Sequence, residues 1–229
     1  MLNGDMSQVI VVRNKATDWQ SSPSSTVRRK RFHLVGEPES GQVTSLVEYL
    51  PGSSFHRHEH PDGEEILVLE GVFSDESGHW PAGTWLLNPE GFVHAPYSAD
   101  GCLLFVKLRQ YPGSEHKQIS WANIPAHQRI CAAGTDVIDF VFDSTLMQQP
   151  DQSISIVSLG EGANQGQLLH RYEGGVEGFV ITGTAILDGQ TLNQYDWFRL
   201  PPGATLDLKA RACTLYLKEN NVRKLMSVS

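Results

Sequence analysis

Short apolar runs of strand length recur along most of the chain and are separated by turn residues. The runs are rich in β-branched and aromatic residues, which favour strands, and almost none of the chain shows the periodicity of a helix. They cover residues 42–50, 64–73, 84–88, 103–108, 153–159, 177–187 and 214–218. Turns such as YLPGSS, HPDGEE and LPPG lie between them. Many strands at short spacing predict an all-β sandwich or barrel, and the longest stretch without a predicted strand is 109–152.

The sequence also contains an internal repeat. At a shift of 112 positions the matched pairs are His58 with His170, Glu65 with Glu177, Gly71 with Gly183, Trp85 with Trp197, Pro89 with Pro201 and Gly91 with Gly203. At a shift of 111, CLLFVK at 102–107 aligns with CTLYLK at 213–218. Matched turn glycines and strand aromatics indicate a duplicated β module. We therefore predict two domains, residues 1–112 and 113–229, that pack as an intrachain pseudo-dimer, in a monomer or in a homodimer.

Composition and charge narrow the setting. Eighteen basic against 26 acidic residues give a net charge of -8, which argues against a nucleic-acid or anionic-membrane partner. The basic run RRKR at 28–31 is expected to form a solvated strand edge on this acidic chain. Cys102, Cys131 and Cys213 form no CxxC pair, and no signal peptide or long apolar segment is present. These features predict a cytoplasmic protein in a reducing compartment.

The stretch HRHEHPDGEE concentrates side chains that bind metals. Strand alternation places His58 and His60 on one face, and Glu64 begins the next strand after a short turn. His94, in NPEGFVHAP, is the candidate for a fourth ligand from a distant strand. Three imidazoles and one carboxylate form a site of borderline hardness, suited to Zn, Fe, Mn, Ni or Cu. His56 shares the face of His58 and is the alternative to one of these ligands.

Several neighbouring residues have structural interpretations. Glu65 is expected to point away from the metal and to make a structural hydrogen bond. Cys102 and Cys213 occupy equivalent strand positions and are expected in the core. The aromatic residues interpreted as core or barrel lining are Trp80, Trp85, Phe92 and Phe105.

These residues resemble the two sequence motifs of the cupin superfamily. The first motif, G-x5-H-x-H-x3-E-x6-G, is matched by Gly52, His58, His60, Glu64 and Gly71. The second, G-x5-P-x-G-x2-H-x3-N, is matched by Gly83, Pro89, Gly91 and His94, with Ser98 in place of the final asparagine. The resemblance implies two tandem jelly-roll barrels, each a double-stranded β-helix. It also implies one divalent metal per chain, Zn first and Fe, Mn or Ni as alternatives, held by His58, His60, Glu64 and His94.

Residues 15–110 are most similar to the cupin domain of ChrR-type anti-sigma factors. Those proteins carry a separate N-terminal helical domain that grips the sigma factor and holds zinc through H-x3-C-x2-C. Nothing in this sequence matches that motif, and too little chain precedes the first module to hold such a domain. The chain therefore resembles the sensing half of that family without its output half. The implied partners are a small-molecule ligand in the first barrel and a sigma factor or other regulatory protein.

The second module is expected to be a degenerate cupin domain without metal ligands. Only His170 is retained, because Tyr172, Val176 and Leu206 stand where the first module has His60, Glu64 and His94. Glu177 lies one position out of phase on its strand and is expected on the opposite face. The aromatic residues expected to fill or line this barrel are Tyr195, Trp197 and Phe198.

Two functions remain open from the sequence. The favoured one is a non-enzymatic module that senses a ligand or oxidant in a transcriptional stress response. The alternative is a metal-dependent dioxygenase or related enzyme acting on a small organic substrate. An enzyme of that kind would normally add an acid or base beside the metal, and only His56 and Tyr97 are candidates. No catalytic residue is assigned, since fold does not decide between the two functions.

Overall fold

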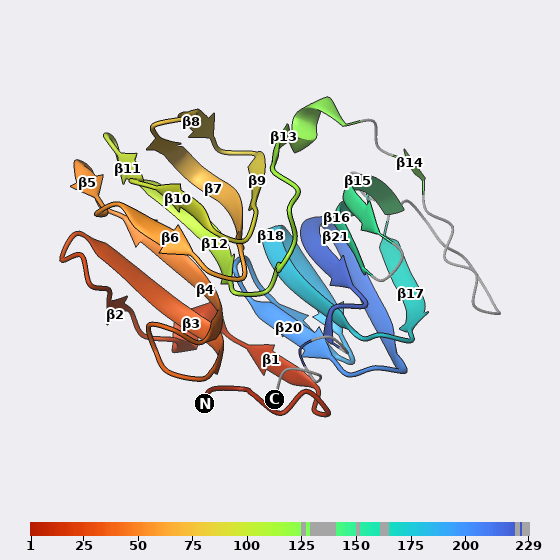
Figure 1. Cartoon of the computed structure of the whole chain (residues 1–229). Coiled ribbons are helices and arrows are strands. Elements are labelled where there is room, and N and C mark those ends of the chain that lie inside the picture. The colour runs from red at the N-terminus through yellow and green to blue at the C-terminus, as the bar shows by residue number, and fades with distance from the viewer. Residues whose placement is uncertain (125–126, 129–140, 150–151, 161–164, 223–224, 226–229) are drawn as a thin grey trace. The chain divides into compact units, whose positions relative to one another are not determined.

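The computed structural model describes residues 1–124, 127–128, 141–149, 152–160, 165–222 and 225. Strands dominate this part of the chain, together with two short 3-10 helices, η1 (Asn14–Ala16) and η2 (Trp121–Asn123) (Figure 1). In these described segments no helix has the length and apolar character needed to cross a bilayer. The predicted all-β class is confirmed.

The chain divides into two compact units, and the division differs from the predicted boundary after residue 112. The first unit contains Met1–Gly4 and Thr17–Asn123, and the second contains Asp5–Ala16 and Ile124–Ser229. Strand β13 (Lys117–Ser120) stays with the first unit because it pairs with β9 (Thr84–Asn88). Strand β1 (Ile10–Val12) joins the second unit because it pairs with β20 (Trp197–Leu200). Pairing between distant segments therefore sets the boundary, which the repeat alone does not show.

The first unit is built around one large sheet and a short two-stranded one. The large sheet has the strand order β13-β9-β7-β12-β4-β3-β2, and β10 pairs with β6 in the short sheet. The remaining bounds are β2 (Gln20–Ser21), β3 (Val27–Val35), β4 (Gln42–Tyr49), β5 (Ser53–Ser54), β6 (His58–His60), β7 (Glu64–Asp75), β8 (Gly78–Pro81), β10 (Phe92–His94), β11 (Tyr97–Ser98) and β12 (Cys102–Leu108). One apolar cluster forms its core, with members from β3, β4, β7, β8, β9 and β12.

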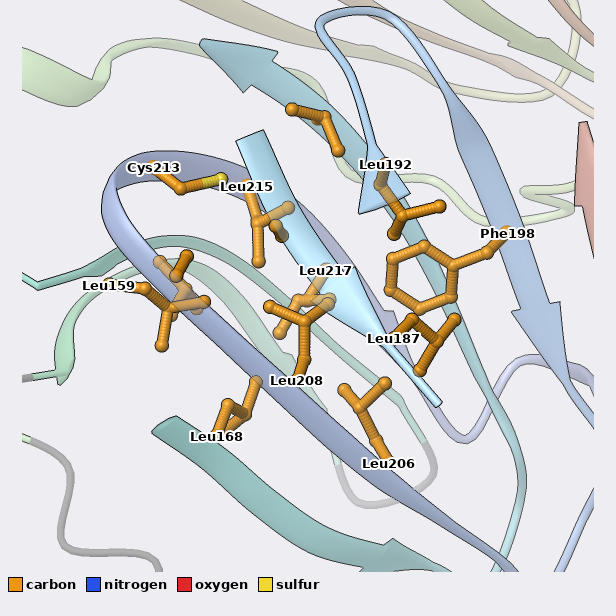
Figure 2. Packing of buried hydrophobic residues seen from close by; sticks show 14 of the residues in the cluster. Leu159, Leu168, Leu187, Leu192, Phe198, Leu206, Leu208, Cys213, Leu215 and Leu217 are labelled. Atoms are coloured by element: carbon orange, nitrogen blue, oxygen red, sulfur yellow. The ribbon is translucent and has the colours of Figure 1, made fainter. Parts of the chain in front are cut away.

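The second unit is built around a nine-stranded sheet. Its order is β1-β20-β18-β21-β16-β15-β14, with β17 paired to β21 and β19 paired to β18. The bounds are β14 (His127–Gln128), β15 (Val141–Gln149), β16 (Gln152–Leu159), β17 (Gly166–Tyr172), β18 (Val176–Leu187), β19 (Gln190–Leu192) and β21 (Ala204–Glu219). A dense leucine-rich cluster fills its interior (Figure 2). Burial of this many apolar side chains is the main favourable term in folding of the unit.

The backbone confirms the internal repeat. Glycines with positive φ recur at a spacing of 112 residues, in the pairs Gly63 and Gly175, Gly71 and Gly183, and Gly91 and Gly203. A Cβ on Gly71 would lie 2.1 Å from the Gly101 oxygen, and one on Gly183 would lie 2.4 Å from the Ala212 oxygen. Both positions therefore require glycine for the same steric reason. The repeat preserves backbone geometry as well as residue type.

Two sequence expectations about strands differ from the structure. The stretch 109–152 contains β13 and β15, which were not predicted. The run RRKR does not form a solvated edge, because it lies in β3, which pairs with β4 on one side and, at Arg28 and Arg29, with β2 on the other. The side chains of Arg29 and Arg31 are only 13% and 11% exposed. Alternation along β3 turns these two guanidinium groups away from the solvent side.

The structural assignments of individual residues are mostly confirmed. Glu65 Oε1 accepts a hydrogen bond of 2.9 Å from Trp85 Nε1, so Glu65 serves a structural role. Cys102 and Cys213 are buried, as expected, whereas Cys131 lies outside the described residues. The residues Trp80, Trp85 and Phe105 are buried, and Phe92 is half-buried.

Candidate metal centre

Three strands of the first unit bring the predicted metal ligands together. His58 and His60 lie at the two ends of β6, and His94 ends β10. The two strands are antiparallel, with the Cα of His94 opposite that of His58. Glu64 is the first residue of β7. The arrangement brings together residues as far apart in the sequence as His58 and His94, which are separated by 36 positions.

A tight turn positions Glu64 beside the histidines. Asp62 and Gly63 have φ values of 58° and 73°, in the left-handed region. A Cβ on Gly63 would lie 2.2 Å from the Tyr111 oxygen, so only glycine fits at this point. Gly63 N also donates to the His60 oxygen at 3.2 Å, which closes the turn. The turn therefore allows a carboxylate to follow the second histidine after only four residues.

The donor atoms of these side chains converge. His60 Nε2 lies 2.9 Å from His94 Nε2. Glu64 Oε2 lies 3.5 Å from His60 Nε2 and 3.6 Å from His94 Nε2. One ring nitrogen of each of His58, His60 and His94 lies within 4.8 Å of the others. The structure therefore brings all four predicted ligands into one cluster.

A divalent transition metal fits this donor set. Ligand atoms that each lie about 2.0–2.2 Å from one ion are at most about 4.4 Å apart. The separations of 2.9, 3.5 and 3.6 Å between His60, His94 and Glu64 satisfy this limit. Nitrogen and carboxylate oxygen are also the ligand types that such metals prefer. The group of His58, His60 and His94 could therefore hold a metal ion, with Glu64 beside it.

Hydrogen bonds to the far side of the rings prepare two histidines for ligation. His58 Nδ1 lies 2.8 Å from the His56 oxygen, and His94 Nδ1 lies 3.0 Å from Asp75 Oδ2. A carbonyl and a carboxylate only accept hydrogen bonds, so each Nδ1 must carry the proton. In the neutral ring this leaves the lone pair on Nε2, the atom available to a metal.

The carboxylate is held in a similar way. Asn88 Nδ2 donates to Glu64 Oε2 at 2.9 Å, and the two residues are Cα partners on neighbouring strands. This hydrogen bond fixes the orientation of the carboxylate while leaving it lone pairs for other partners. Three of the four candidate ligands therefore have a second contact that positions them, as is common around metal sites.

Burial controls the protonation of the site. Burial lowers the pKa of His58, and it lowers the pKa of His60 to about 4. Burial alone would raise the pKa of Glu64, but the nearby His60 and His94 rings and the Asn88 hydrogen bond outweigh it, so the pKa is lowered. At neutral pH His60 is therefore an uncharged ring, and Glu64 is a carboxylate. Both are in the form that binds a metal.

Two cavities adjoin the cluster. One, of about 100 Å³, is lined by His58, His60, Glu64 and His94, with mainly apolar walls. A second, of about 280 Å³, shares His58 and His60 with the first and extends toward Arg109. A small molecule in either cavity would lie next to the cluster. The site therefore combines metal-binding side chains with space for a ligand.

The two other candidate residues from the sequence, His56 and Tyr97, lie outside the metal-binding group. The side chain of His56 is exposed and stacks on Phe55, with ring centroids 4.9 Å apart, and it is outside the metal-binding group. Tyr97 makes an edge contact with His79 and does not line either of the two cavities described above. Tyr97 therefore does not stand where an acid or base beside the metal is needed, whereas His56 lines the larger cavity next to His58, with ring centroids 5.8 Å apart.

Sequence reasoning missed four residues of the site, and one of them is Asn88, which donates to Glu64. Asp75 contacts His94, Tyr49 lines the smaller cavity, and Arg29 lines both cavities. Burial, together with the Glu64 carboxylate, raises the pKa of Tyr49, so its hydroxyl stays protonated. Asp75 and Tyr49 lie outside the spacing of either motif. Arg29 belongs to the run RRKR, which was interpreted as a solvated strand edge, so the position of Arg29 at the cavities was not predicted.

The equivalent positions in the second unit are apolar. Tyr172, Val176 and Leu206 belong to its buried core cluster, whereas His170 is exposed. The positions equivalent to Asp75 and Asn88 hold Leu187 and Leu200, which are also in the cluster. The polar residues that position the ligands in the first unit are therefore replaced by leucine in the second. Figure 2 shows Leu187 and Leu206 among the packed side chains.

The expected aromatic filling of this unit is only partly correct. Phe198 belongs to the core cluster, but Trp197 lies beside the Arg199 guanidinium and Tyr195 stacks on Phe179. Glu177 accepts a hydrogen bond from Asn221 at 2.9 Å and is not a member of the apolar cluster. Leucine, rather than tryptophan or tyrosine, therefore fills most of the interior.

The match to a known protein family covers most of the first unit and little of the second. Residues 7–112 match the family described as the ChrR cupin-like domain. No curated protein matches the chain significantly in sequence.

Solved structures resemble the whole chain. A candidate dioxygenase from Nostoc punctiforme has a TM-score of 0.71 and 12% identity, and the alignment covers 93% of this chain and 82% of that one. The bacterial pirin YhhW from Escherichia coli, in complex with nickel(II), has a TM-score of 0.67 and 16% identity, covering 93% and 98%. A cupin 2 conserved barrel domain protein from Leptotrichia buccalis has a TM-score of 0.58 and 13% identity, covering 96% and 99%. At these identities the likeness concerns the fold.

Proposed function

We propose that this chain, a cupin protein whose residues 7–112 match the ChrR cupin-like domain, is a metal-dependent sensing module. It binds one divalent transition metal through His58, His60, Glu64 and His94 and admits a small ligand or oxidant beside it. The observation that carries this proposal is the convergence of the donor atoms, with His60 Nε2 2.9 Å from His94 Nε2 and Glu64 within 3.6 Å of both.

Three protein groups position the candidate metal ligands. Asp75 holds the His94 ring, the His56 oxygen holds the His58 ring, and Asn88 holds the carboxylate of Glu64. These contacts orient the ligands before a metal arrives and lower the cost of binding it. When bound, the metal supplies a Lewis acid beside the two cavities. We expect Zn as the metal, with Fe, Mn or Ni as alternatives; the nickel(II) in the Escherichia coli pirin is a property of that protein.

The regulatory part of the proposal is supported by the match to the ChrR cupin-like domain. A sensing module needs a site whose occupancy changes with the cell's chemistry, and a metal beside an accessible cavity meets that need. The proposed partner that reads this change is a sigma factor or another regulatory protein. Pull-down of partners with metal-loaded and metal-free protein tests this step, and identical partner sets in the two states would contradict it.

Metal content tests the core of the proposal. Protein purified without added metal should contain about one equivalent of a transition metal per chain, measured by inductively coupled plasma mass spectrometry. His60→Ala should lose nearly all of it, because it removes one of the central ligands. His56→Ala is the matched control, since His56 is exposed and lies outside the group. Wild-type protein without metal, or His60→Ala with full metal, would overturn the assignment.

A second function, a metal-dependent dioxygenase, is favoured by one feature of the site. The cavity of about 100 Å³ reaches all four candidate ligands and is also lined by the Tyr49 side chain. The fold likeness to the candidate dioxygenase is compatible with this function. Oxygen uptake by iron-loaded protein, with catechol as a probe, distinguishes the two functions. Uptake above that of His60→Ala would support the enzyme, whereas equal uptake would leave the sensing role favoured.

A further inference from the structure

The inner wall of the first barrel carries an arginine that lines the same cavity as the metal-binding group. Val27 and Arg29 of β3 line the same cavity as His58, His60 and His94. Their partners across the strand, Tyr49 and Val47, line it as well. The guanidinium of Arg29 therefore shares a cavity with the candidate metal ligands.

The neighbouring arginine of the same strand has the opposite orientation. The Arg28 guanidinium lies 4.7 Å from the centroid of the Trp19 ring and pairs with Glu48. Its side chain is 46% exposed. Successive residues of a strand point to opposite faces, which explains why Arg28 and Arg29 differ so strongly. Arg28 is thus a matched control for changes at Arg29.

Two buried guanidinium groups share one carboxylate at this wall. The side chains of Arg29 and Arg31 are 13% and 11% exposed. Both contact Glu39 Oε1, at 3.2 Å from Arg31 Nη2. Glu39 lies in the connection between β3 and β4, and its side chain is 55% exposed. A solvent-accessible loop therefore supplies the carboxylate for two mostly buried arginines, of which Arg29 lines both cavities and Arg31 lines neither.

This carboxylate does not satisfy both arginines. The Nε atoms of Arg29 and Arg31 are buried and have no hydrogen-bond partner among the described residues. Burial, and then repulsion by Arg29, lowers the pKa of Arg31. The charged side chains that line the larger cavity, Arg29, Glu39, Glu59 and Arg109, balance one another, and Glu64 balances Arg29 in the smaller cavity. These two buried Nε–H groups are therefore unused hydrogen-bond donors.

Most of the remaining wall of the smaller cavity is apolar. The main apolar lining residues are Val43, Val47, Phe55, Ile66, Leu104 and Val106. The two cavities, of about 100 and 280 Å³, are below or at the low end of the roughly 300–1,000 Å³ typical of pockets for drug-sized ligands. A molecule that suits the arginine donors, the apolar wall and these volumes is small, with an apolar body and one anionic group.

We propose that the ligand of the first barrel is a small organic acid whose carboxylate binds Arg29 and Arg31 in place of Glu39. The inference rests on the proposed metal-dependent function, because the apolar body of the acid lies in the cavity beside the metal-binding group. Arginine recognises carboxylates through charge-assisted hydrogen bonds, and Glu39 Oε1 already accepts one such bond from each of the two arginines. The loop carboxylate occupies the arginines in the absence of the ligand and leaves when the acid arrives.

Calorimetric titration of zinc-loaded protein with matched acids and amides tests this inference. The probes are benzoate and hexanoate against benzamide and hexanamide, which have similar shapes but no charge. The acids should bind at least about 10-fold more tightly than the amides, since a charge-assisted pair is lost in the amide. Arg29→Gln should weaken acid binding at least about 10-fold, and Arg28→Gln should leave it unchanged. Glu39→Gln should strengthen it, because the competing carboxylate is removed.

Two further measurements separate this inference from the proposed function. Metal content and thermal melting are recorded for every variant, and Arg29→Lys serves as a second variant that keeps a positive charge if Arg29→Gln fails to fold. Loss of metal from the wild type would overturn the proposed function. Metal-loaded protein that binds acids no better than amides would overturn only the identity of the ligand. Equal acid binding by the wild type and a folded Arg29 variant would also overturn it.

Discussion

The Nδ1 atom of His94 lies 3.0 Å from Oδ2 of Asp75, and both side chains are only 2% exposed. The carboxylate holds the proton on Nδ1 and directs Nε2 toward His60 and Glu64. Asp75 ends β7, whereas His94 ends β10, so the contact also couples two strands of the site. The arrangement makes Asp75 a positioning residue for the metal, although it does not belong to either cupin motif.

Replacement of Asp75 should therefore weaken metal binding without removing a ligand. Asp75→Asn can still contact His94, but its amide can donate to Nδ1 and favour the wrong tautomer. We expect an affinity for zinc about 10- to 100-fold lower, measured by competition with a chromogenic chelator. Asp100→Asn, at an exposed loop position, is the control and should match the wild type. Equal affinities for Asp75→Asn and the wild type would show that Asp75 does not position the ring.

The second unit should not bind a metal. At the positions equivalent to His60, Glu64 and His94 it has Tyr172, Val176 and Leu206, all within an apolar core. Mass spectrometry under non-denaturing conditions should find one metal per chain, and His170→Ala should leave this count unchanged. His58→Ala, at the equivalent position of the first unit, should abolish it. A reproducible count of two metals would contradict this prediction.

Glycine at position 63 should be essential for placing Glu64. Gly63 and Gly52 have nearly equal φ values of 73° and 74°, but only a Cβ on Gly63 would collide, at 2.2 Å from the Tyr111 oxygen. Gly52→Ala should cost about 1–2 kcal/mol of unfolding free energy through backbone strain alone. Gly63→Ala should cost more and should also lower metal affinity, since the turn must shift. Urea unfolding and zinc titration of both variants provide the test, and equal effects would exclude the steric explanation.

The buried thiols should make stability decrease at high pH. Burial raises the pKa of Cys102 to about 11, from the ordinary value of 9.0. Between these values the unfolded chain loses the proton first, so the unfolding free energy falls as pH rises from 9 toward 11. The fall due to one such thiol is roughly 1 kcal/mol per pH unit in this window.

Urea unfolding at pH 8 and pH 10 measures this effect. Other groups also titrate in this range, so the comparison is between the wild type and Cys102→Ala, which lacks the thiol. Cys213, whose pKa burial raises to about 12, offers the same comparison in the second unit. An identical loss of stability in the wild type and both alanine variants would refute the assignment to buried thiols.

The sequence by itself determined the longer apolar strands, the repeat and the four candidate ligands. These features depend on local alternation and on motif spacing, so residues 42–50, 64–73 and 84–88 were recognisable as strands before their pairing was known. The loss of ligands in the second module was also readable, because the 112-residue shift pairs each ligand with its replacement. Turn glycines such as Gly63 carried part of this information, since only glycine tolerates the required backbone.

The tertiary structure decided what surrounds those ligands. Asp75 lies 19 residues from His94, and only the pairing of distant strands brings their side chains together. The run RRKR contains no apolar residue to mark which face is inward, so its alternation was ambiguous until pairing with β4 set Arg29 opposite Val47. The same kind of long-range pairing assigned residues 5–16 to the second unit, through β1 and β20. Local patterns specify which residues alternate, but contacts between distant strands specify what each face meets.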